Sequence, residues 1–187
     1  PDSTRQYLWI TQKLFKEHLA KVQDGDFTLT VDPAFQFEFG KEFRENSDYS
    51  NSHLMQHNGR GFHIMADFGP TVSFQTDFYE NQAALPGYLY RYSQATGVVP
   101  GQGRLKTFNS RGLDFAWATG NVSWTPKTWI NVQLGQGRNF VGNGYRSMLL
   151  SDNAFTYPFV KFSLLSTNKR FQYTVIYAKL QLVGDDD

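Results

Sequence analysis

Alternation of apolar and polar residues is the feature of this chain that most restricts its fold. In the segment 26–41, large apolar residues occupy nearly every second position from Phe27 to Phe39, and mostly polar residues lie between them. Successive side chains of an extended strand point to opposite faces, so this period gives each strand one apolar and one polar face. Strands of this length joined by unequal turns are typical of sheets whose apolar face contacts lipid.

The same alternation predicts seven strands and a simple order for them. Short turns at 68–70, 125–127 and 166–169 alternate with longer loops at 42–53, 81–111 and 138–152. Alternate turns of an antiparallel meander lie at opposite ends, so all the short turns share one end. The sequence therefore predicts an all-β fold, an antiparallel up-and-down outer-membrane β-barrel. Its strands are expected at 26–41, 54–67, 71–80, 112–124, 128–137, 154–165 and 170–183.

Composition agrees with this fold class and excludes several others. Aromatic residues make up 17% of the 187 residues, which suits β-structure with aromatic belts. No apolar run reaches the length of a transmembrane helix. The chain has no cysteine, so disulfides and thiolate metal sites are excluded, and its net charge of +1 gives no sign of a nucleic-acid partner. We expect no cofactor.

An amphipathic helix is predicted over 4–22, before the strands. Leu8, Leu14, Phe15, Leu19 and Val22 fall on one face of this helix. The expected organisation is a periplasmic helix at 1–25 followed by barrel strands at 26–187. Because single-chain bacterial barrels have an even number of strands, seven strands indicate the first part of a larger barrel.

Three segments resemble one family of outer-membrane barrels. They are GQGRNFVGNGYRSMLLSDNAFTYPF at 135–159, KLFKEHL at 13–19 followed by FTLTVDPAFQF at 27–37, and FYENQ at 78–82. Together they resemble the Bacteroidota barrels related to the gliding-motility protein RemB and to Wzi-like capsule assembly proteins, over about 14–182. The resemblance implies an outer-membrane location, a non-enzymatic role in polysaccharide attachment or gliding, and a longer whole chain.

The loop 81–111 is the first candidate binding segment. It has basic and tyrosine side chains and no acidic residue. Arginine pairs with carboxylates and phosphates, and aromatic faces can stack on sugar rings, so an acidic polysaccharide or lipopolysaccharide is the expected ligand. The alternative is a solvated loop whose tyrosines belong to an interfacial belt. The candidate residues are Tyr88, Tyr90, Arg91, Tyr92, Arg104 and Lys106.

The loop 135–152 is the second candidate. Arg138 and Arg146 are expected to contact the same ligand. Two structural alternatives are that the loop folds into the barrel, where Asp152 would pin it through Arg–Asp pairs, or that it only needs positive φ at Gly142 and Gly144. The loop lacks the Gly-Lys-Ser/Thr sequence of a phosphate-binding loop, so nucleotide binding is not expected.

Neither a metal site nor a catalytic centre is predicted. His53 and His57 have helical zinc spacing but lie outside a predicted helix, and the carboxylates of Asp32, Glu38 and Asp77 are expected to solvate the lumen. Trp124 and Trp129 flank a short turn, which predicts a membrane girdle there.

These observations favour a non-enzymatic outer-membrane protein with extracellular long loops and a periplasmic N-terminus. Its expected partners are outer-membrane lipid and lipopolysaccharide, surface polysaccharide, and other envelope proteins that contact the helix. The alternatives are a passive porin, a soluble β-barrel carrier of a small ligand and, least favoured, a glycoside-cleaving enzyme.

Overall fold

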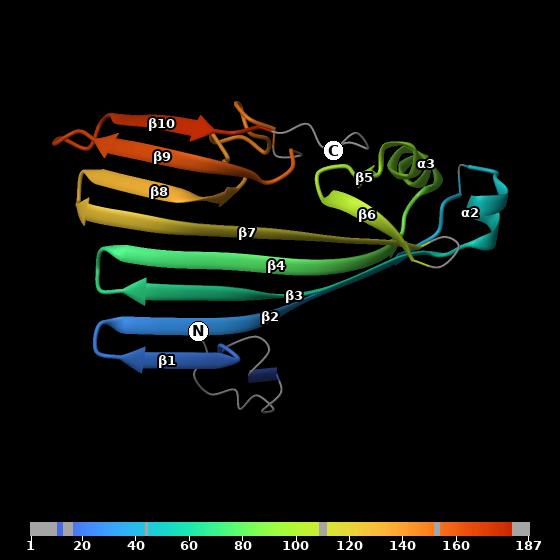
Figure 1. Cartoon of the computed structure of the whole chain (residues 1–187), viewed down its shortest axis with the longest axis horizontal. Coiled ribbons are helices and arrows are strands. Elements are labelled where there is room, and N and C mark those ends of the chain that lie inside the picture. The colour runs from blue at the N-terminus through green and yellow to red at the C-terminus, as the bar shows by residue number, and fades with distance from the viewer. Residues whose placement is uncertain (1–10, 13–16, 44, 109–111, 152–153, 181–187) are drawn as a thin grey trace.

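A single antiparallel meander forms most of this protein. The computed structural model describes residues 11–12, 17–43, 45–108, 112–151 and 154–180. The main path of the sheet runs β1-β2-β3-β4-β7-β8-β9-β10, and β6 pairs with both β5 and β7 (Figure 1). The strands are β1 Ala20–Asp24, β2 Phe27–Gly40, β3 Met55–Phe68, β4 Val72–Ala84, β5 Val98–Val99, β6 Gly103–Phe108, β7 Gly112–Lys127, β8 Ile130–Gly137, β9 Tyr157–Leu165 and β10 Gln172–Ala178.

The predicted all-β antiparallel class is confirmed. Each of the seven predicted segments overlaps one strand of the meander, β2, β3, β4, β7, β8, β9 or β10, and β4 and β7 extend three or more residues beyond the predicted ends at 80 and 124. The sheet is open among the described residues, because β1 and β10 each pair with one neighbour only. Closure into a barrel is therefore not part of this structure.

The connections are sorted by length as the sequence predicts. The turns β1–β2, β3–β4, β7–β8 and β9–β10 lie together at the left of Figure 1, which we call the short-turn end. Gly25 and Gly69 adopt positive φ of 54° and 62° there, a conformation that glycine reaches without steric cost. The longer connections lie at the opposite end, which we call the long-loop end.

The predicted N-terminal helix is wrong at its C-terminal part. Ala20–Asp24 form strand β1, which pairs with Phe27–Val31 of β2. Val22 lies opposite Leu29 and joins the apolar face of the sheet. Thr11 and Gln12 are helical, and the rest of the predicted helix up to residue 16 lies outside the described residues. The count of seven strands was also too low, because β1, β5 and β6 were not predicted.

The two faces of the sheet differ in chemistry. Apolar side chains that point to one side, which we call the apolar face, are strongly exposed: Phe35 is 63%, Trp124 51% and Leu134 60% accessible. The register carries this face across the sheet, because apolar residues stand opposite one another on successive strands. Its larger exposed members are Val22, Phe35, Phe37, Phe39, Phe62, Phe68, Phe78, Val122, Trp124, Leu134, Phe162, Leu164, Tyr173 and Tyr177.

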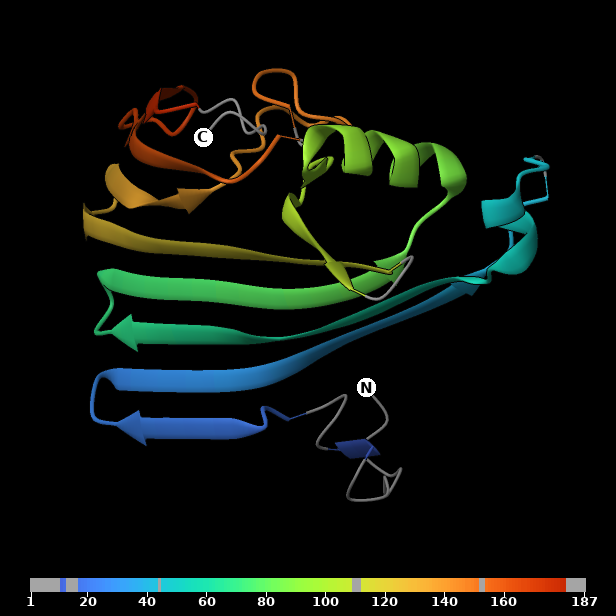
Figure 2. The same ribbon diagram turned by 45° about the vertical axis from the view of Figure 1, so that its right-hand side comes forward.

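The opposite side, which we call the polar face, is hydrogen-bonded in its middle and covered at the long-loop end. Helix α3 (Gly87–Thr96) and the β5–β6 hairpin form a cap there, and the short helix α2 (Asp48–Ser52) lies at the same end (Figure 2). Ala83, Val99, Leu113 and Phe115 form the buried cluster under the cap, with Leu85, Tyr90 and Leu105 packed against it. The main hydrophobic core thus lies at one end of the sheet.

Among the described residues, no helix combines the length and apolar character needed to cross a bilayer.

Candidate functional site

Helix α3 carries four of the predicted ligand residues, and their side chains lie on two different faces of the helix. Tyr88 and Tyr92 are 60% and 52% exposed, and Arg91 between them is also exposed. The spacing of three and four residues places these three side chains on one helix face. Tyr90 points the other way and packs against the buried cluster. Three predicted residues are therefore brought together, and Tyr90 is a core residue.

Arg91 is already paired. Its guanidinium donates a short hydrogen bond to Oε1 of Glu45, in the β2–β3 connection. This hydrogen bond holds the pKa of the Glu45 carboxyl below its usual value. The charge of Arg91 is thus neutralised within the protein, so the aromatic faces of Tyr88 and Tyr92 are the open part of this surface.

The same connection holds the start of α3. Oε2 of Glu42 accepts a hydrogen bond from the backbone N of Gly87 at 2.9 Å, which satisfies a donor that the helix leaves unpaired. Tyr49 stacks on Tyr90 with ring centroids 4.4 Å apart and donates to the carbonyl of Leu85 at 2.9 Å. A carboxylate therefore occupies the N-terminus of α3, which disfavours binding an anion there.

The glycine after α3 ends the helix. Gly97 adopts φ of 68°, and its carbonyl accepts from Leu105 N at 3.0 Å. This contact joins α3 to β6, which holds the predicted residues Arg104 and Lys106. Both are exposed, and Lys106 stands opposite Asp114 in the register with β7. They lie on the β6 strand of the cap rather than on the exposed face of α3.

The loop 138–156 is tied to the cap by Arg138. The guanidinium donates a short hydrogen bond to the carbonyl of Gly101, in the β5–β6 turn, and burial lowers the pKa of Arg138. The next residue, Asn139, is buried and its backbone N donates to Oη of Tyr157 at 2.9 Å. Arg138 thus joins two connections, and the predicted Arg–Asp pair with Asp152 lies outside the described residues.

The tip of this loop is closed by two hydrogen bonds. Met148 N donates to Val141 O at 2.8 Å, and Val141 N donates to Oγ of Ser147 at 3.0 Å. The tip presents Tyr145, which is 89% exposed, with the Arg146 guanidinium 5.3 Å from the centre of its ring. Arg146 therefore lies beside an exposed aromatic ring that the sequence analysis did not select.

Of the three residues predicted to shape this loop, one behaves as expected. Gly142 has φ of 111°, and a Cβ there would lie 2.8 Å from Cγ of Met148. Gly144 does not adopt positive φ, so the prediction for it was wrong. Of these two glycines only Gly142 has positive φ. Asp152 lies outside the described residues.

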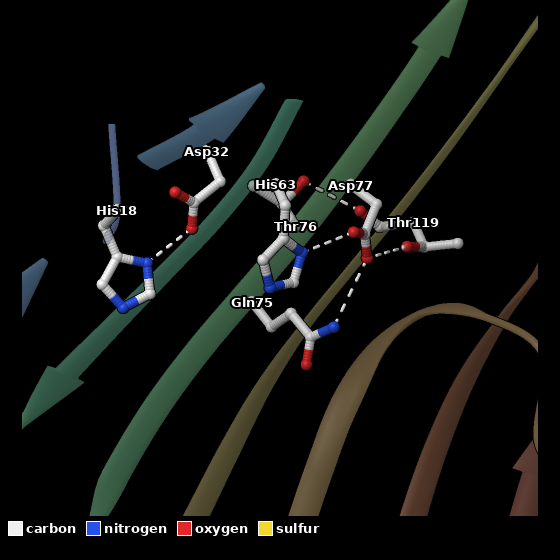
Figure 3. A network of polar contacts seen from close by, with 7 residues as sticks. All are labelled: His18, Asp32, His63, Gln75, Thr76, Asp77 and Thr119. Atoms are coloured by element: carbon white, nitrogen blue, oxygen red, sulfur yellow. Dashed lines mark hydrogen bonds and ion pairs between the residues drawn. The ribbon is translucent and has the colours of Figure 1, made fainter. Parts of the chain in front are cut away.

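A row of hydrogen-bonded side chains crosses the polar face (Figure 3). Asp32, His63, Asp77 and Thr119 stand opposite one another on β2, β3, β4 and β7. Asp77 accepts from Nδ1 of His63 at 2.5 Å and from Oγ1 of Thr119 at 3.1 Å. Both aspartates were predicted to solvate the lumen, but their histidine partners were not predicted, because these contacts depend on the register of the strands and on segments far apart in the chain.

Asp32 also holds the segment that leads into β1. Its carboxylate accepts from Nδ1 of His18 at 2.6 Å and from Leu19 N at 3.0 Å. Both oxygens are used, and Asp77 is similarly engaged. Within the described residues no group of three or more His, Cys, Asp or Glu side chains is arranged to hold a metal ion. The row therefore consists of two internal ties, one from His18 to Asp32 on β2 and one that joins His63, Asp77 and Thr119 on β3, β4 and β7.

The two predicted girdle residues lie at the short-turn end. Trp124 is on the apolar face opposite Val72, and Trp129 precedes β8. Their exposed fractions are 51% and 53%.

No family model matches the chain, and no significant match was found among curated proteins or solved structures.

Proposed function

We propose that this chain is the membrane-embedded part of a bacterial outer-membrane β-barrel that acts, without catalysis, in binding surface polysaccharide at its long-loop end. The observation that carries the proposal is the apolar face, which is exposed across the meander while the opposite face is polar. An exposed apolar surface of this extent needs a covering, and lipid covers the outside of a barrel in this way.

The positions at which the apolar face ends toward the long-loop end support a membrane more strongly than the size of the face does. Beyond Phe62 and Phe78 toward the long-loop end, the next outward residues are Arg60 and Glu80, which form an ion pair at 3.0 Å. In the strand register, this border lies farthest toward the long loops on β2 and closer to the short turns on β8 and β9. The last outward apolar residues before a polar one are Phe39, Phe62, Phe78, Ala116, Leu134 and Pro158, on β2, β3, β4, β7, β8 and β9.

A diagonal border is what tilted strands produce. Strands of outer-membrane barrels tilt by about 35–45°, so a level membrane surface cuts neighbouring strands at different residues. A soluble sandwich has no reason to end its apolar residues along such a line. The short turns at one end and the long connections at the other agree with the same orientation, with long loops outside the cell.

The outer edges of β1 and β10 need further strands to pair with them in a membrane. In lipid, each unpaired backbone group costs several kcal/mol, so an open sheet does not persist there. Among the described residues, β1 and β10 pair on one side only. We infer that additional strands pair with these edges and complete the barrel.

The aromatic residues of the long-loop end are the proposed glycan-binding surface. Tyr88 and Tyr92 on α3 and Tyr145 at the loop tip expose their rings. Sugar rings present apolar C–H faces that pack on aromatic rings, whose faces carry partial negative charge. Because Arg91 is ion-paired, stacking on these rings, with Arg146 beside Tyr145, supplies most of the contact.

A passive porin is the second candidate, favoured by the polar face. The cap argues against it, since α3 and the β5–β6 hairpin pack on that face at the long-loop end. A soluble carrier is less suited, because carriers of apolar ligands need an apolar interior, whereas here the apolar side chains point to the exposed face and the polar ones are hydrogen-bonded to each other.

Orientation in the membrane can be tested by cysteine labelling, because the natural chain has no cysteine. Tyr145→Cys at the long-loop end should react with a membrane-impermeant maleimide on intact cells. Asn168→Cys in the β9–β10 turn should react only after the outer membrane is opened. Equal labelling of both in intact cells, or recovery of the chain in the soluble fraction, would contradict the membrane proposal.

The glycan proposal has its own test. The double variant Tyr88→Ala, Tyr92→Ala should lower binding to surface polysaccharide by about ten-fold, because two stacking faces are lost. Tyr173→Ala, which removes an exposed tyrosine of β10 far from the cap, is the matched control. Binding is measured on an array of acidic and neutral bacterial polysaccharides, and equal binding of the double variant and the control would refute this site.

A further inference from the structure

A trough runs along β9 on the apolar face. Its floor is formed by Val160 and Pro158, and its walls by Leu134 of β8 and Tyr177 of β10, in a depression of about 410 Å³. Val160 stands directly opposite both Leu134 and Tyr177 in the register. Leu134 and Tyr177 are 60% and 67% exposed, so they project on either side of a lower middle row.

The trough has one closed and one open end. Toward the short-turn end, the next outward residue of β9 is Phe162, whose larger ring ends the low floor. Toward the long-loop end, Lys179 lines the trough, and its backbone N donates to Pro158 O at 3.1 Å. The floor from Phe162 to Pro158 is about 13 Å long at the rise of a β-strand.

The shape and charge of the trough match one kind of lipid. A straight apolar channel parallel to the strands fits an acyl chain, and an exposed ammonium group at the border of the apolar face fits a phosphate. Lys179 lies at the end that the proposed function places outside the cell, where the outer leaflet carries phosphorylated glycolipid.

We propose that this trough binds an acyl chain of the lipid A part of lipopolysaccharide, with Lys179 pairing with its phosphate. This inference rests on the proposed membrane orientation, and it assigns a site on β8–β10 that is separate from the cap. Lipid at this site is held in one place, whereas lipid on the rest of the apolar face exchanges.

The test uses the full chain in detergent micelles, titrated with bisphosphorylated lipid A and followed by native mass spectrometry. Val160→Phe fills the floor of the trough and should weaken lipid A binding by about ten-fold, because the buried methylenes of the chain lose their contacts. Val122→Phe makes the same change on β7, on the apolar face outside the trough, and should leave binding unchanged. Equal effects of the two variants, or none from Val160→Phe, would overturn the site.

A second pair of variants examines the phosphate contact. Lys179→Gln should weaken binding of lipid A by roughly five-fold and leave binding of dephosphorylated lipid A unchanged. Lys169→Gln, at the short-turn end, is the control and should have no effect. Equal losses from the two lysine variants would remove the phosphate assignment.

Competition distinguishes the source of the lipid. Lipid A should displace cardiolipin, a phosphorylated glycerolipid, and displacement in the opposite direction would overturn the assignment to lipopolysaccharide. If the protein spans the membrane, the two valine and two lysine variants should all keep the cysteine-labelling pattern described for the membrane proposal. A result that refutes the lipid site can therefore be distinguished from one that refutes the membrane proposal.

Discussion

At the residue scale, two glycines of the sheet have very different surroundings. A Cβ on Gly61 of β3 would lie 2.0 Å from the carbonyl oxygen of Phe78, a backbone atom of the paired strand β4. A Cβ on Gly120 of β7 would come no closer than 3.5 Å to Oγ1 of Thr76, an ordinary contact. Backbone cannot move aside as a flexible side chain can, so only Gly61 is required by packing.

We therefore expect Gly61→Ala to destabilise the folded protein by about 3 kcal/mol through overpacking of β3 against β4. Gly120→Ala should change the free energy of unfolding by less than about 1 kcal/mol, since alanine also restricts the unfolded chain. Urea unfolding in detergent micelles measures both. Similar unfolding midpoints for the two variants would show that the approach of β4 to Gly61 is not as close as described.

No local pattern in the sequence distinguishes Gly61 from Gly120. Both glycines lie in alternating segments and both were assigned to strands. The contact of Gly61 depends on which residue of β4 stands beside it, and that follows from the register. The hydrogen bond between His63 and Asp77 has the same origin, since these residues lie on different strands and are adjacent only across the sheet.

At the element scale, the strands and α3 differ in how far local sequence defines them. Strand β2 was predicted at 26–41 and lies at Phe27–Gly40, because period-two alternation is a local property. Helix α3 was missed because Gly87–Thr96 begins with glycine and has no acidic residue in its first turn. Glu42 and Glu45, which bind Gly87 N and Arg91, lie more than forty residues earlier.

Strand β1 was missed for a different reason. Apolar residues up to Val22 continue the helical spacing of the preceding segment. The short segment that forms β1 was therefore predicted as part of a helix and not as a strand. Pairing with Phe27–Val31 of β2, and the hydrogen bonds of Asp32 to His18 and Leu19, favour the extended conformation. Tertiary hydrogen bonds thus override a weak local preference.

The tie between Glu45 and Arg91 makes the attachment of α3 depend on pH. The hydrogen bond from Arg91 lowers the pKa of Glu45 below its ordinary value of 4.5. Because the folded-state pKa is depressed, the stabilisation is present above pH 4.5 and is lost as the pH falls through the lowered value. Hydrogen exchange of the α3 amides, corrected for its intrinsic pH dependence, should accelerate over that interval.

Glu45→Gln is the control for this prediction. It keeps the size of the side chain and removes its titration, so the acceleration should be weaker and α3 should exchange faster at neutral pH. An unchanged pH profile in Glu45→Gln would assign the effect to another carboxylate, such as Glu42.

At the scale of the whole molecule, neighbouring residues of β7 face different surroundings in the proposed membrane. Val122 is outward on the apolar face at mid-height, between Phe74 and Leu134 in the register. Ser123 points to the polar face, where its Oγ accepts a hydrogen bond from Nδ2 of Asn131 at 2.8 Å. Val122→Lys should cost about 2–4 kcal/mol in a bilayer, whereas Ser123→Lys should cost about 1 kcal/mol, the value of one hydrogen bond.

Unfolding titrations in liposomes compare these two lysine variants. In water Val122, already 42% exposed, would accept lysine with little penalty, because most surface substitutions change stability by less than about 0.5 kcal/mol. A smaller loss in the free energy of unfolding for Val122→Lys than for Ser123→Lys would therefore indicate a soluble sheet.

The sequence alone determined seven of the eight strands of the meander, their order and the ends to which the turns belong, because alternation and turn length are encoded locally. Only the tertiary structure decided the partners: the cap on the polar face, the Arg91–Glu45 pair, the aspartate–histidine row and the trough along β9. Each depends on the register and on packing between distant segments, which no local pattern specifies.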